Sequence, residues 1–166
     1  MILRSTVSSV VAAGLLALPA TAAQAAPSAQ DAEFLRSAHQ INLAEIAGGR
    51  IAWQKSSDEG VKELAATLMR NHIRLDAQVT QAARTLRVAL PAVPTAAQQA
   101  LTARYQAAPA GTFDDLFVAT QQQAHRDALR LVEEQVAKGS DPVATKVAQA
   151  AAPIIAGHHR QLAAAD

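Results

Sequence analysis

The chain has 166 residues, enough for one domain with a hydrophobic core. Half of the residues are hydrophobic and only 3% are aromatic, with alanine dominant, so the composition favours close-packed helices over sheets rich in aromatic and β-branched residues. Fifteen basic and fourteen acidic residues are interspersed along the chain, which argues against a nucleic-acid partner, and the absence of cysteine excludes disulfides and thiolate metal ligands.

The N-terminus has the pattern of a secretory signal peptide. Arg4 precedes an apolar run over residues 10–18, and a small-x-small cleavage motif ends at Ala25. We therefore expect cleavage after Ala25, export to the periplasm or the extracellular space, and a mature domain of residues 26–166. The run is too short to cross a membrane, so no integral span is expected once the signal peptide is removed. Removal takes away Arg4 and no acidic residue, which leaves fourteen residues of each sign.

The first two predicted helices form one hairpin. Ser28 and Asp31 make a capping box, and the helix that follows extends to about Lys55, with apolar or small residues spaced by three and four. The turn SSDEG comes next, with Ser56 as the expected cap of the second helix, which ends before Pro91. Because the turn is short, the two helices should be antiparallel neighbours.

A long connection separates this hairpin from the next one. Three prolines fall between residues 91 and 109, where they interrupt any long helix. Thr95 and Gln98 form a capping signal between them, which predicts one short helix near residues 96–107. The connection is long enough to run back along the whole length of a helix pair.

The second hairpin contains the third and fourth long helices. Thr112 and Asp115 are the expected cap of the third helix, and Gly139 is its expected stop. Asp141 is the expected cap of the fourth helix, with Pro142 in its first turn. The short turn between them again predicts antiparallel neighbours.

A proline in the fourth helix affects its predicted shape. Pro153 removes one helical hydrogen bond and clashes with the carbonyl four residues earlier, so we expect a kink near residues 149–153 or a division into two helices. Two tight hairpins joined by a long crossover predict an all-α fold. The specific expectation is a ferritin-like four-helix bundle with a short extra helix in the crossover.

Each long helix places one titratable residue on its buried stripe. In chain order these residues are Glu45, His72, His125 and His158. Counted from the turns at a rise of about 1.5 Å per residue, Glu45 and His72 differ in height by only about 5 Å. The other two lie at similar distances from the second turn. We therefore expect all four in one layer at mid-height, where burial is costly unless they pair or bind something.

Two interpretations of this cluster are open. In the first, the three imidazoles and the Glu45 carboxylate bind a single zinc, copper or iron ion, which nitrogen and oxygen donors suit. In the second, Glu45 and waters satisfy the histidines, and the network only sets helix register in a structural or stress-related envelope interaction protein. An enzyme with oxygen chemistry at one iron is a more distant third. The sequence assigns no catalytic residue and no protein partner, and it leaves homo-oligomerisation open.

A di-iron ferritin site is disfavoured by the residues around these histidines. Such a site uses Glu-x-x-His pairs and further glutamates whose carboxylates bridge two cations. The positions three residues before the three histidines hold Met69, Gln122 and Ile155 instead of glutamate. Glu45 is then the only carboxylate on the seam, and one carboxylate cannot supply the bridges. Ferroxidase or iron-storage activity is therefore not expected.

The other histidines and the tryptophan have structural interpretations. His159 is about 100° around its helix from His158, so we expect it at the rim or on the surface. His39 lies on a different helix face from the seam residue of its own helix. Trp53 is expected to close one end of the bundle together with crossover residues such as Tyr105.

The chain resembles a known bacterial family in the order of three segments, DAEFLRSAHQINLAEIAGGRIAWQKSSDEGVKELAATLMRNH, GTFDDLFVATQQQAH and KGSDPVATKVAQAAAPIIAGHHRQLA. The family is domain-of-unknown-function family 4142 (DUF4142), and the resemblance covers residues 31 to about 164. It rests on Glu45, a Met-x-x-His motif ending at His72, the Phe-Asp pair that precedes His125, and a Pro-x-x-x-x-His motif ending at His158.

The resemblance implies an exported protein with a ferritin-like fold. Members of the family are often labelled as outer-membrane proteins, and the family has no assigned activity. Members commonly carry an aspartate just before the histidine of the second helix, where this chain has Asn71. The resemblance therefore bears on fold and location, and it leaves the chemistry open.

Overall fold

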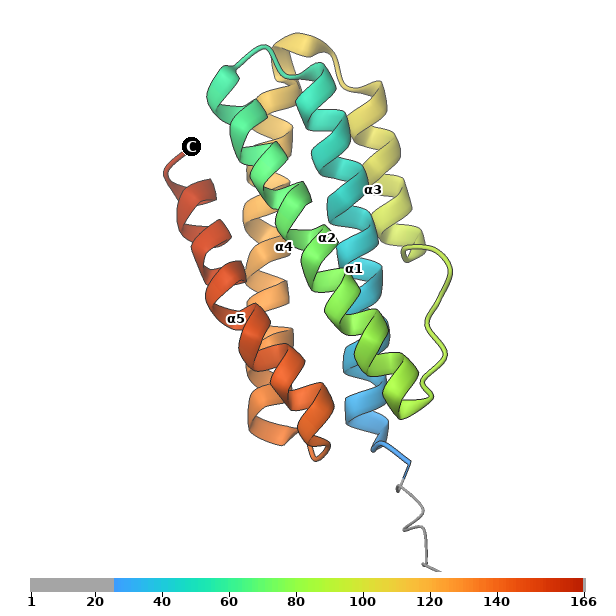
Figure 1. The fold of residues 1–166 in the computed structure, drawn as a ribbon. Helices are drawn as coiled ribbons and strands as arrows, with labels where there is room; N and C mark the ends of the chain where they lie inside the picture. The colour runs from blue at the N-terminus through green and yellow to red at the C-terminus, as the bar shows by residue number, and fades with distance from the viewer. Residues whose placement is uncertain (1–25, 166) are drawn as a thin grey trace, which may run out of the picture.

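The computed structural model of the protein describes residues 26–165, so the predicted signal peptide lies outside the described residues. Within this range the chain forms five helices and no strands (Figure 1). They are α1 (Ala29–Lys55), α2 (Glu59–Leu86), α3 (Ala96–Ala107), α4 (Ala110–Lys138) and α5 (Pro142–Ala163). The prediction of an all-α fold is confirmed.

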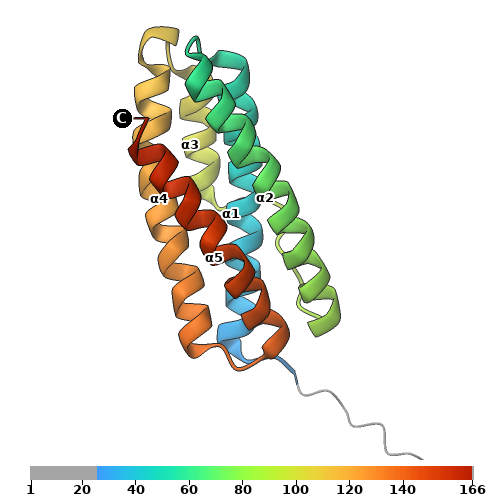
Figure 2. The ribbon, with the colours of Figure 1, turned by 60° about the vertical axis from the view of Figure 1, so that its left-hand side comes forward.

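The four long helices are arranged as two hairpins side by side. α1 packs against α2, and α4 packs against α5, while the hairpins meet along α1 and α4 and along α2 and α5 (Figure 1 and Figure 2). α2 ends at the opposite end of the bundle from the start of α4, so residues 87–109 run back along the outside. α3 lies in this connection and covers α1 and part of α4.

The interior has two hydrophobic clusters with a polar layer between them. One cluster includes Phe34, Leu75, Val132 and Ile155, and the other includes Leu68, Phe113, Phe117 and Leu162. Six buried polar residues lie along the long helices between the residues of the two clusters, namely Asn42, Glu45, His72, Gln121, His125 and His158. The other buried polar residues, Asp31, Ser56 and Gln135, lie near the ends of the helices. The fold therefore places Glu45 and the three buried histidines at mid-height.

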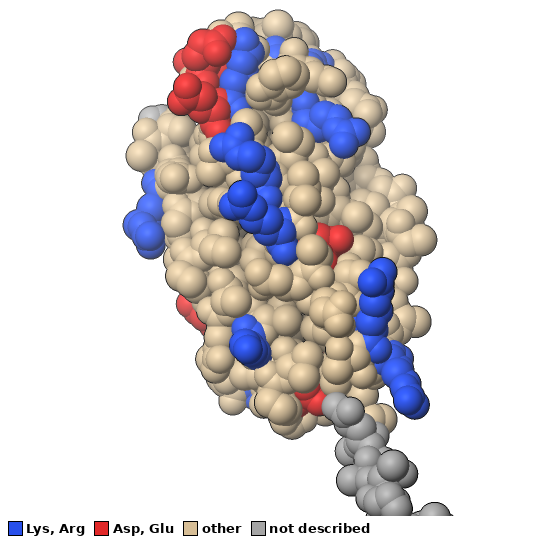
Figure 3. Space-filling model, viewed as in Figure 1, with Lys and Arg blue, Asp and Glu red and all other residues tan. Residues whose placement is uncertain are grey.

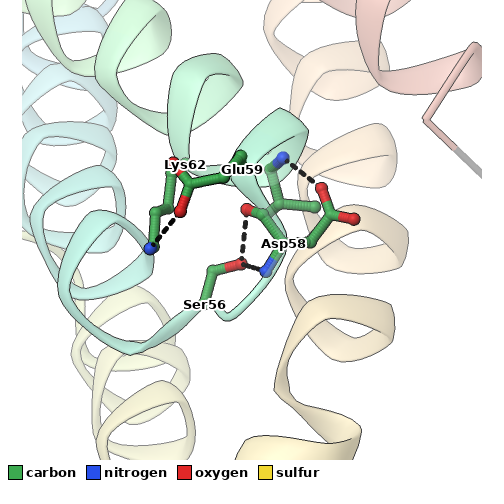
Figure 4. Close-up of polar contacts among 5 residues, drawn as sticks. Ser56, Asp58, Glu59 and Lys62 are labelled. Atoms are coloured by element: carbon green, nitrogen blue, oxygen red, sulfur yellow. Dashed lines mark hydrogen bonds and ion pairs between the residues drawn. The ribbon is translucent and has the colours of Figure 1, made fainter.

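The turn between α1 and α2 is capped by Asp58 and not by Ser56. Asp58 Oδ1 accepts a hydrogen bond from the Val61 N–H at 2.9 Å, which makes Asp58 the N-cap of α2 (Figure 4). Ser56 Oγ accepts from the Asp58 N–H at 3.1 Å, and Lys62 pairs with Glu59 at 2.6 Å. The expected Ser56 cap is wrong, because α2 begins at Glu59 and the cap is the residue directly before the first helical one.

α4 begins earlier than its expected cap. Ala110 is its first residue, and Pro109 occupies the N-cap position without a side-chain cap bond to any described residue. The Thr112 hydroxyl instead donates to the Pro109 carbonyl at 3.4 Å. The predicted cap at Thr112 and Asp115 is therefore wrong. In contrast, the predicted capping box at the start of α3 is confirmed.

α5 is a single helix that contains a proline. Asp141 caps it and Pro142 occupies its first turn, as predicted. Pro153 lies inside the helix, yet the element continues to Ala163, so the predicted division into two helices is wrong. Pro153 and Gln149, whose carbonyl loses its helical partner, are both exposed. Water can therefore satisfy the free carbonyl, and the helix continues.

The turn between α4 and α5 needs a glycine because of crowding. Gly139 has a φ of −62°, which any residue adopts, so it does not form a left-handed helix stop. A Cβ atom at this position would lie 2.2 Å from Gln135 Nε2 and 2.7 Å from Thr145 Oγ1. The predicted helix end is correct, and the glycine is explained by the close approach of neighbouring atoms and not by a left-handed stop.

The buried carboxylate of Asp31 ties the start of α1 to this second turn. It accepts hydrogen bonds from Ser28 Oγ at 2.5 Å, Gln135 Nε2 at 2.6 Å, Ser140 Oγ at 2.8 Å and the Asp141 N–H at 3.1 Å. Burial alone would raise the pKa of Asp31, but these hydrogen bonds outweigh it and lower the pKa to about 2. Asp31 therefore joins the two hairpins at one end of the bundle.

The surface in Figure 3 is mixed in charge. Basic side chains stand at several separate places on this face, and acidic side chains gather beside the turn between α1 and α2. In the described part of the chain, no helix has the length and apolar character that crossing a membrane requires.

Trp53 does not close the end of the bundle. Its side chain is 56% exposed, so the expected packing with Tyr105 is wrong. Tyr105 is buried and packs against Phe113 and Phe117, with ring centroids 6.1 and 5.5 Å away. Ala52 occupies the buried position next to Trp53, and one step of about 100° along the helix turns the indole outward.

Candidate metal centre

Three imidazoles meet in the polar layer. They are His72 from α2, His125 from α4 and His158 from α5, and all three side chains are buried. One ring nitrogen of each lies within 4.8 Å of one ring nitrogen of the others. The ring centroids are 5.6, 5.4 and 5.3 Å apart. The structure therefore brings together the three histidines that the spacing placed on the seam.

Hydrogen bonds define the tautomers of two of these rings. His72 Nδ1 lies 2.8 Å from Asn42 Oδ1, and His125 Nδ1 lies 3.0 Å from the Gln121 carbonyl oxygen. The Gln121 backbone carbonyl can only accept, so His125 Nδ1 carries the proton and His125 Nε2 a lone pair. With the Asn42 amide oxygen towards its Nδ1, His72 has the same tautomer and likewise a lone pair on Nε2. The two Nε2 atoms are 3.5 Å apart. Two lone pairs that face each other at this distance repel.

The third ring, His158, has one nitrogen engaged and one free. Its Nε2 lies 2.9 Å from the side-chain amide nitrogen of Asn71. Its Nδ1 is buried and has no hydrogen-bond partner among the residues that the structure describes. A buried polar atom without a partner is costly, which makes Nδ1 the third candidate donor atom. With the amide nitrogen donating to Nε2, Nδ1 carries the ring proton, so it can bind a metal only after Asn71 turns its oxygen towards Nε2 and the proton moves there.

Glu45 is buried on α1, but the structure does not bring it into the group of three. Within residues 26–165, the close set of ligand atoms contains only the histidines. Asn42, almost one turn earlier, faces His72 in its place, and Glu45 reaches the side chain of Gln121. Sequence reasoning missed Asn42 and Gln121. The available signal was the three-residue spacing of Asn42 and Glu45, which places both on one helix face.

Burial keeps these groups neutral. It lowers the pKa of His72 well below its usual range, and the charges that the other two rings would carry lower it further. Burial also lowers the pKa of His125 and of His158 to about 4. The rings are therefore unprotonated at neutral pH, which is the form that binds metals. Burial raises the pKa of Glu45 to about 8, and the hydrogen bond with Gln121 offsets only part of this rise.

The sequence matches one known family. A family model described as "Domain of unknown function (DUF4142)" matches residues 16–165. The chain belongs to the DUF4142 family. No curated protein matches it in sequence. A crystal structure of a DUF305 fragment from Deinococcus radiodurans is similar, with a TM-score of 0.73 and 14% identity over 84% of this chain and 97% of that chain. At this identity the likeness shows the fold alone.

Two ring nitrogens of this DUF4142 protein lie at the separation that one metal ion requires, and a ring nitrogen of His158 lies within 4.8 Å of a nitrogen of each of these rings. A tetrahedral zinc ion with bonds of about 2.05 Å holds two nitrogens roughly 3.3 Å apart. The Nε2 atoms of His72 and His125 are 3.5 Å apart. Asn42 and the Gln121 carbonyl orient these two rings by accepting from their other nitrogens, as oxygen acceptors do in protein metal sites. Neutral imidazole donors suit zinc, copper and iron.

The two other histidines of this DUF4142 chain lie outside the group. His39 Nδ1 is 2.7 Å from Asp76 Oδ1, and this contact links α1 to α2. His159 is half-buried, which agrees with the rim position expected for it. The candidate centre therefore consists of the three seam histidines.

Proposed function

We propose that this DUF4142 protein binds a single zinc, copper or iron ion through Nε2 of His72, Nε2 of His125 and Nδ1 of His158. The observation that carries the proposal is the 3.5 Å approach of two Nε2 atoms whose neighbours leave each with a lone pair. A bound cation replaces the repulsion between these lone pairs by two favourable contacts. The free Nδ1 of His158 supplies the third donor.

The donor set supports one ion and not two. Two-metal sites in helical bundles need carboxylates that bridge the ions. The group of close ligand atoms in the described chain contains three histidines and no carboxylate. Three protein donors leave a fourth coordination position for a water molecule or another small ligand.

We also propose that the protein is exported and that its fold is related to ferritin-like four-helix bundles. Export is supported by the signal-peptide pattern over residues 1–25. The ferritin-like relationship is supported by two hairpins joined through the crossover of residues 87–109. N-terminal sequencing of the protein from the extracytoplasmic fraction tests export, and the expected first residue is Ala26. Recovery of the intact N-terminus from the cytoplasm contradicts it.

The competing interpretation is a hydrogen-bonded network that only sets the register of the helices in an envelope interaction protein. The contacts of Asn42 and Asn71 with the imidazoles favour it. In such a network His72 Nε2 must donate to His125 Nε2, which requires Asn42 to turn its amide nitrogen towards His72 Nδ1. The separation of 3.5 Å between the two Nε2 atoms also exceeds the usual range of about 2.7–3.2 Å. The network also leaves Nδ1 of His158 without a partner. Metal binding therefore accounts for more of the geometry.

Elemental analysis tests the metal centre directly. The protein is purified without a histidine tag, loaded separately with zinc, copper or iron, and freed of loose metal. We expect one equivalent of one of these metals in the wild type and almost none in His72→Ala. His39→Ala is the matched control, because it removes a histidine outside the group, and it should retain the metal.

Circular dichroism confirms that each variant is folded before its metal content is compared. Wild-type protein that retains none of the three metals contradicts the proposal, and so does a His72→Ala variant that retains as much metal as the wild type. Metal-free protein whose stability falls in His72→Ala supports the architectural interpretation instead.

A further inference from the structure

A second candidate site lies outside the metal centre, in a cleft where α3 covers α1 and α4. The cleft has a volume of about 250 Å³. Its walls are mostly apolar, and they include Ile41, Ala44, Leu101 and Ala124. Tyr105 forms part of its lining, and the Tyr105 hydroxyl lies 2.5 Å from Thr120 Oγ1, which ties α3 to α4. This hydrogen bond therefore positions the Tyr105 side chain at the wall of the cleft.

Two buried polar side chains line this cleft, and one of them has an acceptor without a hydrogen-bond partner among the described residues. Glu45 is 5% exposed and Gln121 is 2% exposed, and both belong to the lining. Gln121 Nε2 donates to the Tyr105 hydroxyl at 3.5 Å, but Gln121 Oε1 has no hydrogen-bond partner within the part of the chain that the structure describes. Burial of such acceptors is costly unless a donor reaches them.

The ionisable residues of the described lining are all acidic groups. Its titratable groups are Glu45, Tyr105 and, at the rim, Asp127, which already pairs with Arg130. No lysine, arginine or histidine is among the described residues that line the cleft. Burial raises the pKa of Glu45 to about 8, so this side chain is a neutral acid at neutral pH, and a cation beside it would favour its carboxylate form. The site therefore offers acceptors to a ligand that carries positive charge and several donors.

We propose that this cleft binds a small organic amine in its protonated form, with the ammonium group on Glu45 and Gln121 and the alkyl part against the apolar walls. An ammonium group has three N–H donors. Glu45 and Gln121 supply three oxygen acceptors between them, two from the carboxylate and one from the amide. Ile41 and Leu101 provide apolar surface for a short alkyl chain.

The residues that line the cleft fit an amine better than the other classes of small ligand. An anion would find no basic side chain in the described lining to offset the cost of its burial. Magnesium and calcium need about six oxygen ligands, whereas the buried part of the cleft offers only one carboxylate and one free amide oxygen. A neutral apolar ligand leaves Gln121 Oε1 unpaired.

The amine site does not depend on the proposed metal centre. Its two polar residues are not members of the histidine group. The nearest link is Gln121, whose backbone carbonyl accepts from His125 while its side chain lines the cleft. Binding of an amine can therefore be measured in protein without metal, and failure of either proposal leaves the other standing.

A titration with three ligands of similar shape tests the proposal. Butylammonium, 1-butanol and butyrate are added separately to ¹⁵N-labelled protein, and amide chemical shifts are followed by NMR. We expect butylammonium to shift the amides of Leu101 and Gln121, with at least tenfold weaker binding of 1-butanol and none of butyrate. In Glu45→Gln the affinity for butylammonium should fall by about tenfold or more, because a charge-assisted hydrogen bond is lost.

Glu33→Gln is the matched control for charge, since it makes the same change at an exposed position on the same helix. It should bind butylammonium as the wild type does. Gln121→Leu tests the amide separately and should weaken binding as well. Equal binding of 1-butanol and butylammonium overturns the proposal, as does unchanged affinity in Glu45→Gln or the absence of any shift at millimolar butylammonium. A shift of the same amides by magnesium alone also overturns it.

Discussion

Asn71 determines which nitrogen of His158 is free. It contacts Nε2 at 2.9 Å, and as an amide it can present either a donor or an acceptor to that atom. When the amide donates, Nε2 must hold a lone pair, and the proton of the neutral ring is on Nδ1. Metal binding through Nδ1 needs the opposite tautomer, with the proton on Nε2 and an oxygen of residue 71 as its acceptor.

Asn71→Asp should therefore strengthen metal binding. A carboxylate only accepts, so it holds the proton of His158 on Nε2 and leaves a lone pair on Nδ1. Groups in this position change metal affinity by about ten- to hundredfold, and we expect an increase of about tenfold. Competition with a chromogenic chelator measures the affinity. Asn71→Leu, which removes the contact, should bind more weakly than Asn71→Asp, and equal affinity of the two variants contradicts this role.

Glu45 should make the protein less stable as the pH rises towards 8. Its pKa is about 8 in the folded protein and 4.5 ordinarily, so its contribution is complete below pH 4.5 and is lost as the pH rises through 8. The buried histidines act with the opposite sign. For His125 and His158, with a pKa of about 4 against 6.5 ordinarily, stability is present above pH 6.5 and is lost as the pH falls through 4.

Glu45→Gln separates the two effects. Between pH 6 and 8 the free energy of unfolding of the wild type should fall relative to that of the variant by about 2 kcal/mol. Urea denaturation of both proteins across this range measures the difference, and the histidine contributions cancel because both proteins contain them. A difference that does not change with pH shows that Glu45 does not hold its proton in the folded state.

The ends of α1, α4 and α5 are held together by one side chain. Asp31 accepts hydrogen bonds from α1's own cap, from Gln135 at the end of α4 and from the backbone that begins α5. Contacts within the apolar clusters are not directional, so they do not by themselves fix how far one hairpin is shifted along the other. Directional bonds to a buried carboxylate fix the relative position of the two hairpins at this end.

Asp31→Asn should destabilise the protein by about 3 kcal/mol, because bonds to a buried charge are lost and an amide group faces existing donors. The folded-state pKa is about 2 against 3.8 ordinarily, so the stability that Asp31 contributes is present above pH 3.8 and is lost as the pH falls towards 2. Urea denaturation at neutral pH and near pH 3 checks both points. Asp127→Asn, an exposed aspartate with a local partner, is the control and should cost about 0.5 kcal/mol or less. A similar loss of stability in the two variants contradicts this role of Asp31.

The whole molecule is needed to form the candidate metal centre. His72 belongs to the first hairpin, whereas His125 and His158 belong to the second. In the unfolded chain these residues are far apart in sequence, and neither hairpin alone contains all three. A metal bound by all three histidines should therefore stabilise the complete bundle relative to the separated hairpins and the unfolded chain.

Addition of the metal should raise the stability of the wild type by about 2.7 kcal/mol at a concentration one hundred times the dissociation constant. Thermal denaturation with and without metal measures the effect, and a chelator should reverse it. His72→Ala should show no such rise. A rise of the same size in the variant means that the metal binds elsewhere.

The amino-acid pattern alone determined the helices and the inward position of the histidines. Helix periodicity and local capping residues are properties of neighbours in sequence, and for this reason the short helix over 96–107 and the cap at Asp141 agree with the structure. The same periodicity pointed His72, His125 and His158 into one layer. These features depend only on the rise and rotation of a helix.

The tertiary structure alone decided the partners of each buried polar group. Asn42 and Glu45 are about 60° apart on one helix, and periodicity does not say which of them faces His72 and which faces Gln121. That choice depends on the rotation of α1 against its neighbours and on the side chains of α3 and α4. The continuity of α5 through Pro153 was decided in the same way, because it depends on which face of the helix meets solvent.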